Sequence, residues 1–154
     1  MEERVRIARG ALRAILAHAR AAAPDECCGL LVGRPDGIER AVAARNLSDS
    51  RTRYLIDPRQ HFAAIRAARE AGRAVVGFYH SHPSSAPIPS DRDLAEATYP
   101  DAVYLIAGRT PRGTLSRVRA FRLEAGRFRE VVLRPLADEA VGPQPRKGTA
   151  TLPQ

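Results

Sequence analysis

Two histidines and a nearby carboxylate have a spacing that could bind a metal ion. His80 and His82 directly follow the apolar run at residues 74–79, and the segment 90–93 begins eight residues after His82. Residues two apart on a strand point to the same side, with Cα atoms about 6.5–7 Å apart, so the two imidazoles could share an ion. Taken alone, the pair is also compatible with histidines that only hydrogen-bond locally at the end of a strand.

The carboxylate that could complete this site is Asp93. Ser90 and Asp93 have the spacing of a capping box, which predicts that a helix begins here. Capping and metal binding are compatible, because a helix start would hold the Asp93 side chain in one direction. Two histidines and one carboxylate leave the fourth tetrahedral position of Zn²⁺ open for water, which is typical of a catalytic zinc site.

A hydrolytic zinc site also needs a general base, and Glu26 is the candidate. The metal-activated water must lose a proton, and the leaving amine must later gain one. Glu26 stands just before the apolar run that starts at Cys28. A glutamate in a surface loop would be the ordinary alternative explanation for it.

Strands and helices that alternate along the chain must position these residues. Apolar runs and turn residues predict strands at residues 4–8, 28–33, 38–44, 54–56, 74–79, 102–107, 115–123 and 128–133. Helical spacing predicts a helix from about residue 11 that ends near Pro24, a second helix that runs to about Gly72, and a third from Ser90 to before Pro100. The second helix should start with Asp57 as N-cap, Pro58 in the first position and Gln60 closing a capping box. The pattern indicates an α/β fold with mixed strand pairing.

Length and composition fit one domain. The chain has 154 residues, of which 44% are hydrophobic and 27% charged, enough for one buried core. Residues 1–136 should form the domain, whereas residues 137–154 are rich in Gly, Pro, Gln and Thr and predict a disordered tail. No apolar run approaches the roughly 18 residues of a membrane span.

The N-terminal residues and the cysteines favour a cytoplasmic location. The start Met1-Glu2-Glu3-Arg4 lacks the pattern of a secretory signal. Cys27 and Cys28 are adjacent in sequence, and adjacent cysteines rarely meet disulfide geometry.

The basic charge raises the question of nucleic acid, but its pattern does not favour it. A formal net charge of +8 and a pI near 10.6 are in the range of nucleic-acid-binding domains. Only Lys147 is a lysine, however, and the arginines are spread along the chain instead of forming a run. Electrostatic steering of a small acidic protein stays open.

The candidate residues together resemble the signature of the JAMM (MPN+) zinc metalloproteases. Glu26, then His80-Ser81-His82, seven residues, and Ser90-x-x-Asp93 match every defined position of that signature. The resemblance extends over about residues 4–134. It implies a single MPN/JAMM domain with a mixed, mostly antiparallel β-sheet, about three flanking helices and a cytidine-deaminase-like core.

The resemblance also implies a role for each residue of the signature. His80, His82 and Asp93 would bind one Zn²⁺, Glu26 would act as general base and then general acid, and Ser90 would stabilise the oxyanion. Other polar residues are then assigned to structure or to the surface: Cys27 and Cys28 at the strand entry, His18, His61, and Asp91 as a solvated or supporting acid.

The implied activity is that of an (iso)peptidase that uses metal-activated water to cleave after the C-terminal Gly-Gly of ubiquitin-like or sulfur-carrier β-grasp proteins. Only 53 residues separate Glu26 from His80, so the insertions of larger deubiquitinases do not fit, and the chain is similar to compact bacterial and archaeal members. In one bacterial branch the enzyme removes a cysteine from a sulfur carrier, and this is the leading substrate class. The loop from Pro83 to Pro89 could form the rim of the groove for the Gly-Gly tail, or be a plain connector.

Other functions and a homodimer stay open to different degrees. A non-catalytic MPN scaffold is disfavoured because all five signature residues are present. A DNA-associated JAMM-type domain is disfavoured because Ser81 departs from its His-Asn-His pattern. A zinc nucleobase deaminase would need His-x-Glu and Pro-Cys-x-x-Cys, which do not occur.

Overall fold

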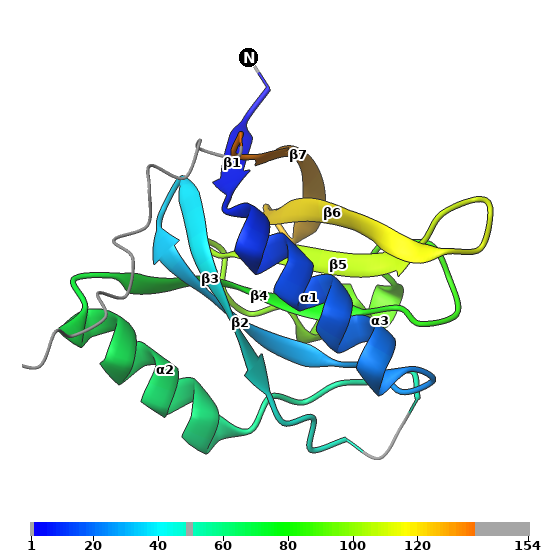
Figure 1. Ribbon diagram of the computed structural model, residues 1–154, viewed down its shortest axis with the longest axis horizontal. Helices are drawn as coiled ribbons and strands as arrows, with labels where there is room; N and C mark the ends of the chain where they lie inside the picture. The colour runs from blue at the N-terminus through cyan, green and yellow to red at the C-terminus, as the bar shows by residue number, and fades with distance from the viewer. Residues whose placement is uncertain (1, 49–50, 138–154) are drawn as a thin grey trace, which may run out of the picture.

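The structure of the chain is a computed structural model that describes residues 2–48 and 51–137. Seven strands and three helices alternate along this part of the chain (Figure 1). Their bounds are β1 (Arg4–Ile7), α1 (Arg9–Ala22), β2 (Cys28–Arg34), β3 (Gly37–Ala44), α2 (Pro58–Glu70), β4 (Ala74–Ser81), α3 (Asp91–Glu96), β5 (Val103–Arg109), β6 (Leu115–Glu124) and β7 (Arg127–Pro135).

The strands form a closed barrel in the order β1-β3-β2-β4-β5-β6-β7. The pairs β2–β3, β2–β4, β5–β6 and β6–β7 are antiparallel, whereas β1–β3, β1–β7 and β4–β5 are parallel. The predicted mixed, mostly antiparallel pairing with three helices is therefore confirmed. The sheet also closes on itself, because β1 pairs with both β3 and β7, and the predicted elements did not indicate this.

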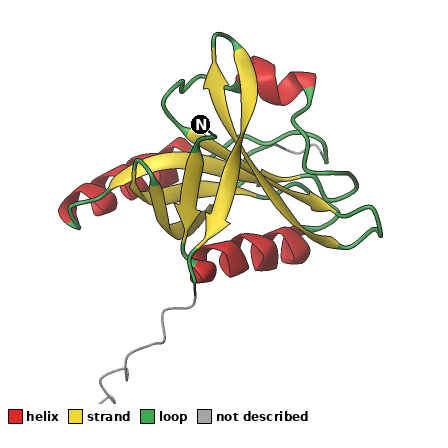
Figure 2. Cartoon of the chain, turned by 90° about the horizontal axis from the view of Figure 1, so that it is seen from above, coloured by secondary structure: helices red, strands yellow, loops and turns green. Residues whose placement is uncertain are grey.

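Two hydrophobic clusters lie on opposite faces of the strands. Helix α1 buries Ala11, Ile15 and Ala19 in one cluster, and α2 buries Ala64 and Ala68 in the other. Figure 1 shows α1 lying across the strands, and Figure 2 shows the strands running between the helices. Both helices bury small residues, which lets them pack closely on the sheet.

Strand β4 is central, as predicted, and its two faces have different tasks. It pairs with β2 on one side and with β5 on the other. Tyr79 belongs to the cluster on the α1 side, whereas Phe78 belongs to the cluster on the α2 side. Because side chains alternate along a strand, His80 points to the same side as Phe78. The α2 side of β4 therefore carries His80 at its carboxyl end.

The predicted strand at residues 54–56 is wrong. The segment makes only an isolated bridge, between Ile56 and Asn46. The backbone N–H of Leu55 donates to the side-chain oxygen of Asn46 at 3.0 Å, where a strand would offer a backbone carbonyl. Backbone pairing with residues 45–47 is limited to two hydrogen bonds, from Leu47 N–H to Leu55 O at 2.8 Å and from Asp57 N–H to Arg45 O at 3.1 Å. Because the Asn46 side chain takes up the Leu55 N–H, this pairing does not extend into a strand.

The predicted start of α2 is confirmed for Asp57 and Pro58 but not for Gln60. Asp57 is the N-cap and accepts from the backbone N–H of Arg59 at 2.9 Å, with Pro58 in the first position. Gln60 does not close a capping box, because its side-chain oxygen accepts from the backbone N–H of Arg45 instead. Gln60 therefore ties α2 to the end of β3.

Helix α3 begins as predicted but ends at Glu96, earlier than the expected stop before Pro100. No helix in residues 2–48 and 51–137 is long and apolar enough to cross a membrane. The predicted disordered tail lies outside the described residues from position 138 onward, so the proposed domain boundary at residue 136 stays a prediction.

Candidate metal centre

The structure brings His80, His82 and Asp93 together in one buried cluster. The Nε2 atom of His80 lies 3.1 Å from Asp93 Oδ1, and Nε2 of His82 lies 3.0 Å from Asp93 Oδ2. The two Nε2 atoms are 3.2 Å apart. The exposed fractions of the three residues are 2%, 8% and 8%. Residues from β4, from the segment after it and from α3 therefore present three ligand atoms to one point.

The hydrogen bonds of His82 determine which of its nitrogens can bind a cation. Its Nδ1 lies 3.1 Å from the backbone carbonyl oxygen of Ala86, and a carbonyl oxygen can only accept. Nδ1 must therefore carry the proton, which leaves Nε2 of the neutral ring as an acceptor. That acceptor faces a carboxylate oxygen of Asp93 at 3.0 Å. Two acceptors at this distance repel each other unless a cation lies between them, and this cation is either a proton or a metal ion.

The start of α3 orients Asp93 through a complete capping box. The backbone N–H of Asp93 donates to Ser90 Oγ at 3.0 Å, and the backbone N–H of Ser90 donates to Asp93 Oδ2 at 2.9 Å. Burial alone would raise the pKa of Asp93, but hydrogen bonding with His80 and His82 outweighs it and holds that pKa well below its usual range. The carboxylate is therefore ionised and held in one direction.

The loop between β4 and α3 is packed closely against β5, which positions the Ala86 carbonyl. The backbone N–H of Arg109 donates to Ser85 O at 2.7 Å, and Arg109 Nε donates to Pro83 O at 2.7 Å. A Cβ atom on Gly108 would come within 2.5 Å of Pro87 N, so this close approach requires glycine. The loop supports His82 in this way.

Glu26 lies beside the cluster, just before the start of β2. Cys28 pairs with His80, and the backbone N–H of Ser81 donates to Cys27 O at 3.1 Å, so the same register brings Glu26 opposite His82. Glu26 has an exposed fraction of 6%, and its Oε2 has no hydrogen-bond partner among the described residues. Burial raises the pKa of Glu26 to about 7, and the Asp93 charge adds to this while His82 opposes it. A carboxyl group with such a pKa can both accept and donate a proton near neutral pH.

Ser81 and Cys27 hold Glu26 in place from the opposite side of the strand. The backbone N–H of Cys27 donates to Ser81 Oγ at 2.9 Å, and both residues are buried. Ser81 therefore links β2 to β4 between the two histidines. Cys27 and Cys28 are buried free cysteines, as expected for residues at the strand entry.

The remaining histidines lie away from the cluster. His18 Nδ1 lies 2.7 Å from the hydroxyl of Tyr79 on the α1 side of β4, and burial lowers its pKa. His61 packs edge-on against Phe78, with ring centroids 5.4 Å apart. Asp91 is exposed in the first turn of α3. These positions agree with structural or surface roles.

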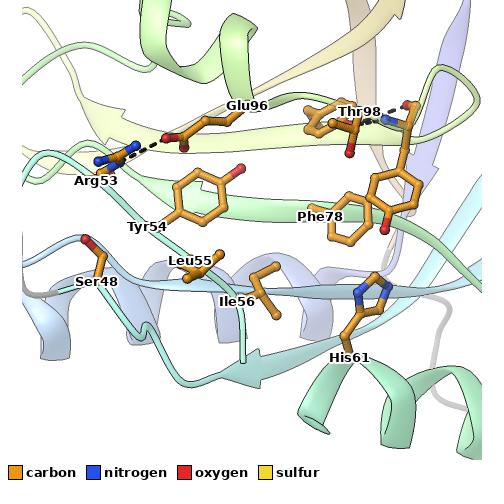
Figure 3. Close-up of a pocket in the computed structure, with 11 residues that line it drawn as sticks. Ser48, Arg53, Tyr54, Leu55, Ile56, His61, Phe78, Glu96 and Thr98 are labelled. Carbon is orange, nitrogen blue, oxygen red and sulfur yellow. Dashed lines mark hydrogen bonds and ion pairs between the residues drawn. The ribbon is translucent and has the colours of Figure 1, made fainter. Parts of the chain in front are cut away.

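Tyr54 and Asn46 lie near the cluster, but no sequence pattern predicted a role for either residue. The Tyr54 ring is stacked on the His80 ring, with centroids 4.4 Å apart and an angle of 19° between the planes. Tyr54 also lines an open groove of about 610 Å³ whose wall includes Phe78, Tyr99 and Tyr104 (Figure 3). Asn46 joins this segment to Glu26, because its Nδ2 donates to Glu26 O at 3.1 Å. Both residues belong to a connection that propensity describes as an isolated strand and a loop.

The donor set fits Zn²⁺. Ligands of a tetrahedral zinc ion with bonds of about 2.0–2.1 Å lie about 3.3 Å apart, close to the 3.2 Å between the two Nε2 atoms. Each Nε2 also lies 3.0 to 3.1 Å from one oxygen of the Asp93 carboxylate. Two imidazole nitrogens and one carboxylate oxygen also match the ligand types of catalytic zinc sites. The carbonyl of Ala86 bound to Nδ1 is the usual outer support of a metal-binding histidine.

A scan against protein-family models matches residues 8–124 to the family described as prokaryotic homologs of the JAB domain. The chain belongs to this family. The predicted relation to JAMM proteins is thereby confirmed, since the match covers both the cluster and Glu26.

This prokaryotic JAB-domain chain is similar to curated proteins with named activities. It is 38% identical over 137 residues to a desampylase of Haloferax volcanii, which covers 83% of this chain and 94% of the relative. It is 37% identical over 123 residues to a CysO-cysteine peptidase of Mycobacterium tuberculosis, which covers 77% of this chain and 82% of the relative.

A solved structure supports the fold. The structure described as "JAMM: A Metalloprotease-like Zinc Site in the Proteasome and Signalosome" matches with a TM-score of 0.55 and 25% identity. The match covers 86% of this chain and 98% of the other. The JAB-domain fold therefore accounts for almost all the described residues.

Proposed function

We propose that this chain is a zinc-dependent (iso)peptidase that cleaves adducts or extensions after the C-terminal Gly-Gly of a small ubiquitin-like or sulfur-carrier β-grasp protein. One observation carries the proposal: three acceptor atoms converge at a buried point beside a buried carboxyl group that lacks a hydrogen-bond partner among the described residues. Such a cluster is costly to the fold unless it binds a cation.

His80, His82 and Asp93 would hold one Zn²⁺ per chain. When bound, the ion supplies Lewis-acid activation of the substrate carbonyl and lowers the pKa of water toward about 7. The protein contributes the direction of each ligand: Ala86 O orients His82, and the capping box orients Asp93.

Glu26 would move the proton. Its unpaired Oε2 is free to accept a proton from the attacking water and to deliver it to the leaving amine nitrogen. A pKa raised to about 7 suits both halves of this task near neutral pH. The buried position next to His82 also excludes bulk water from the transfer.

Ser90 would stabilise the oxyanion. Its Oγ accepts from the backbone N–H of Asp93, so its hydroxyl hydrogen remains available for donation. Ser90 is exposed, which gives a substrate carbonyl access to that hydrogen. A donor placed at the developing charge stabilises the transition state more than the ground state.

The names of the relatives support the substrate class. A desampylase and a CysO-cysteine peptidase both cover more than three quarters of this chain. The shared chemistry is a bond at the C-terminus of a small carrier protein, either an isopeptide bond or a linear peptide bond. The loop at residues 83–89 could form the rim against which the tail lies.

The decisive experiment is intact-mass analysis of Gly-Gly-tailed β-grasp proteins that carry either a C-terminal extension or a lysine-linked adduct. We expect the zinc-loaded chain to release the added group directly after Gly-Gly, and Glu26→Gln to release none while still binding zinc. Cleavage by Glu26→Gln, or no cleavage of either substrate by zinc-loaded protein, would refute the proposal. The relative rates on the two substrates rank linear against isopeptide bonds.

A further inference from the structure

We infer that Tyr54 is a positioning residue that holds the His80 imidazole in its metal-binding orientation, and that Asn46 holds Tyr54 in place. The inference rests on the proposed metal-binding role of His80. It adds two residues that lie outside the signature residues, and both come from the connection between β3 and α2.

The contact between Tyr54 and His80 restricts the histidine ring. The rings are nearly parallel, at 19°, with centroids 4.4 Å apart, which is an offset-stacked arrangement. His80 meets Asp93 through the edge that bears Nε2. Tyr54 covers a face of the imidazole, so a rotation that moved Nε2 away from Asp93 would break the stacking. No described residue hydrogen-bonds to the Tyr54 hydroxyl, so the ring and not the hydroxyl restricts His80.

Asn46 determines where Tyr54 lies. Its Nδ2 donates to the backbone carbonyl oxygens of Glu26, at 3.1 Å, and of Arg53, at 3.2 Å. Its Oδ1 accepts from the backbone N–H of Leu55 at 3.0 Å. The residues on both sides of Tyr54 are thus bonded to one amide group, and the same amide is bonded to the residue proposed as the general base. Asn46 therefore links the position of Tyr54 to that of Glu26.

A second link ties the same segment to α3. Arg53 Nε lies 3.0 Å from Glu96 Oε1, across the groove that Tyr54 lines (Figure 3). Both partners are partly exposed, so this ion pair contributes little to stability by itself. It joins the segment of Tyr54 to the helix that carries Asp93.

The test is metal affinity in the full chain, measured by Zn²⁺ competition with a chromophoric chelator, together with the visible absorption of the Co²⁺-loaded protein. Tyr54→Phe keeps the ring, and we expect Zn²⁺ affinity within twofold of the unsubstituted chain. Tyr54→Leu removes the ring, and Asn46→Ala removes its support. We expect each to bind Zn²⁺ roughly 3- to 30-fold more weakly and to change the Co²⁺ absorption. Leu55→Ala is the matched control, because Leu55 is adjacent to Tyr54 and 57% exposed.

Several outcomes would overturn the inference. The first is unchanged Zn²⁺ affinity and unchanged Co²⁺ absorption in both Tyr54→Leu and Asn46→Ala. The second is a loss of Zn²⁺ affinity in Tyr54→Phe as large as that in Tyr54→Leu. The third is an unsubstituted chain that binds neither Zn²⁺ nor Co²⁺. Thermal unfolding of the metal-free variants checks the fold, and Asn46→Ala decides the matter if Tyr54→Leu does not fold. Failure of the unsubstituted zinc-loaded chain to cleave carrier conjugates would refute the proposed function but not this inference.

Discussion

At the scale of single residues, backbone atoms decide how the histidine and the glutamate of the candidate site behave. The carbonyl of Ala86 determines the tautomer of His82, and the register of β2 against β4 places Glu26 opposite His82. Both effects depend on where the chain runs and not on the type of the neighbouring side chain. The candidate site therefore combines the five signature residues with the backbone that orients them.

Glu26 should lower the stability of the metal-free protein at neutral pH. Its pKa is raised from the usual 4.5 to about 7 in the folded chain, so the unfolded chain loses this proton at lower pH than the folded chain. Stability from this group is therefore present at pH 4 and is lost as the pH rises toward 7. Glu26→Gln should raise the free energy of unfolding at pH 8 by roughly 2–3 kcal/mol and change it little at pH 4.

Urea unfolding in the presence of a chelator measures this difference. Asp25→Asn, at the exposed neighbouring position, is the control and should change stability little at either pH. Equal stability of Glu26→Gln and the unsubstituted chain at pH 8 would show that the buried carboxyl group carries no such penalty.

At the scale of elements, two helix starts with similar chemistry have different tasks. Asp57 caps α2 and Ser90 caps α3, each by accepting a hydrogen bond from the backbone of the first turn. Only in α3 does the backbone N–H of the cap residue also donate to a side chain of the metal cluster, that of Asp93. The same local motif therefore supports a fold in one place and a ligand in the other.

Ser90→Ala should affect stability and zinc binding, whereas Asp57→Ala should affect stability alone. Each substitution removes a cap and should lower the free energy of unfolding of the metal-free protein by about 1 kcal/mol. Ser90→Ala should also weaken Zn²⁺ binding roughly 10-fold, because Asp93 loses part of its support. Urea unfolding and chelator competition measure the two effects. Equal zinc affinities of the two variants would mean that the α3 cap does not orient Asp93.

At the scale of the whole molecule, barrel closure by the first strand joins the two ends of the described chain. Ile7 of β1 is fully buried and pairs with Ile38 of β3 and with Pro135 of β7. The backbone N–H of Leu136 donates to Ile7 O at 2.8 Å. The strand therefore holds together the two halves of the sheet, although it contributes no residue to the metal cluster.

Ile7→Ala should destabilise the whole domain. Loss of a fully buried isoleucine costs about 2–5 kcal/mol through lost burial and the cavity that remains. Arg6→Ala, at the exposed neighbouring position of the same strand, should change the free energy of unfolding by about 0.5 kcal/mol or less. Urea unfolding compares the two. A similar small loss in both variants would show that the domain is stable without closure by β1.

The sequence by itself was enough to predict the seven strands and the three helices, the capping box at Ser90 and the grouping of His80, His82 and Asp93. Local rules decide these features, because hydrophobic period, capping and i, i+2 spacing act over a few residues. The one predicted strand that failed, at residues 54–56, has only a short backbone pairing with residues 45–47 and also bonds to the side chain of Asn46.

Only the tertiary structure decided the rest. The stacking of Tyr54 on His80 and the bond of Asn46 to Glu26 join residues far apart in the chain. The raised pKa of Glu26 results mainly from burial, which also depends on packing. The closure of the barrel by β1 has the same origin, since it pairs residues 4–7 with residues 132–135. Spacing along a sequence determines the direction of a side chain on its own element, but burial and contact depend on how the elements pack.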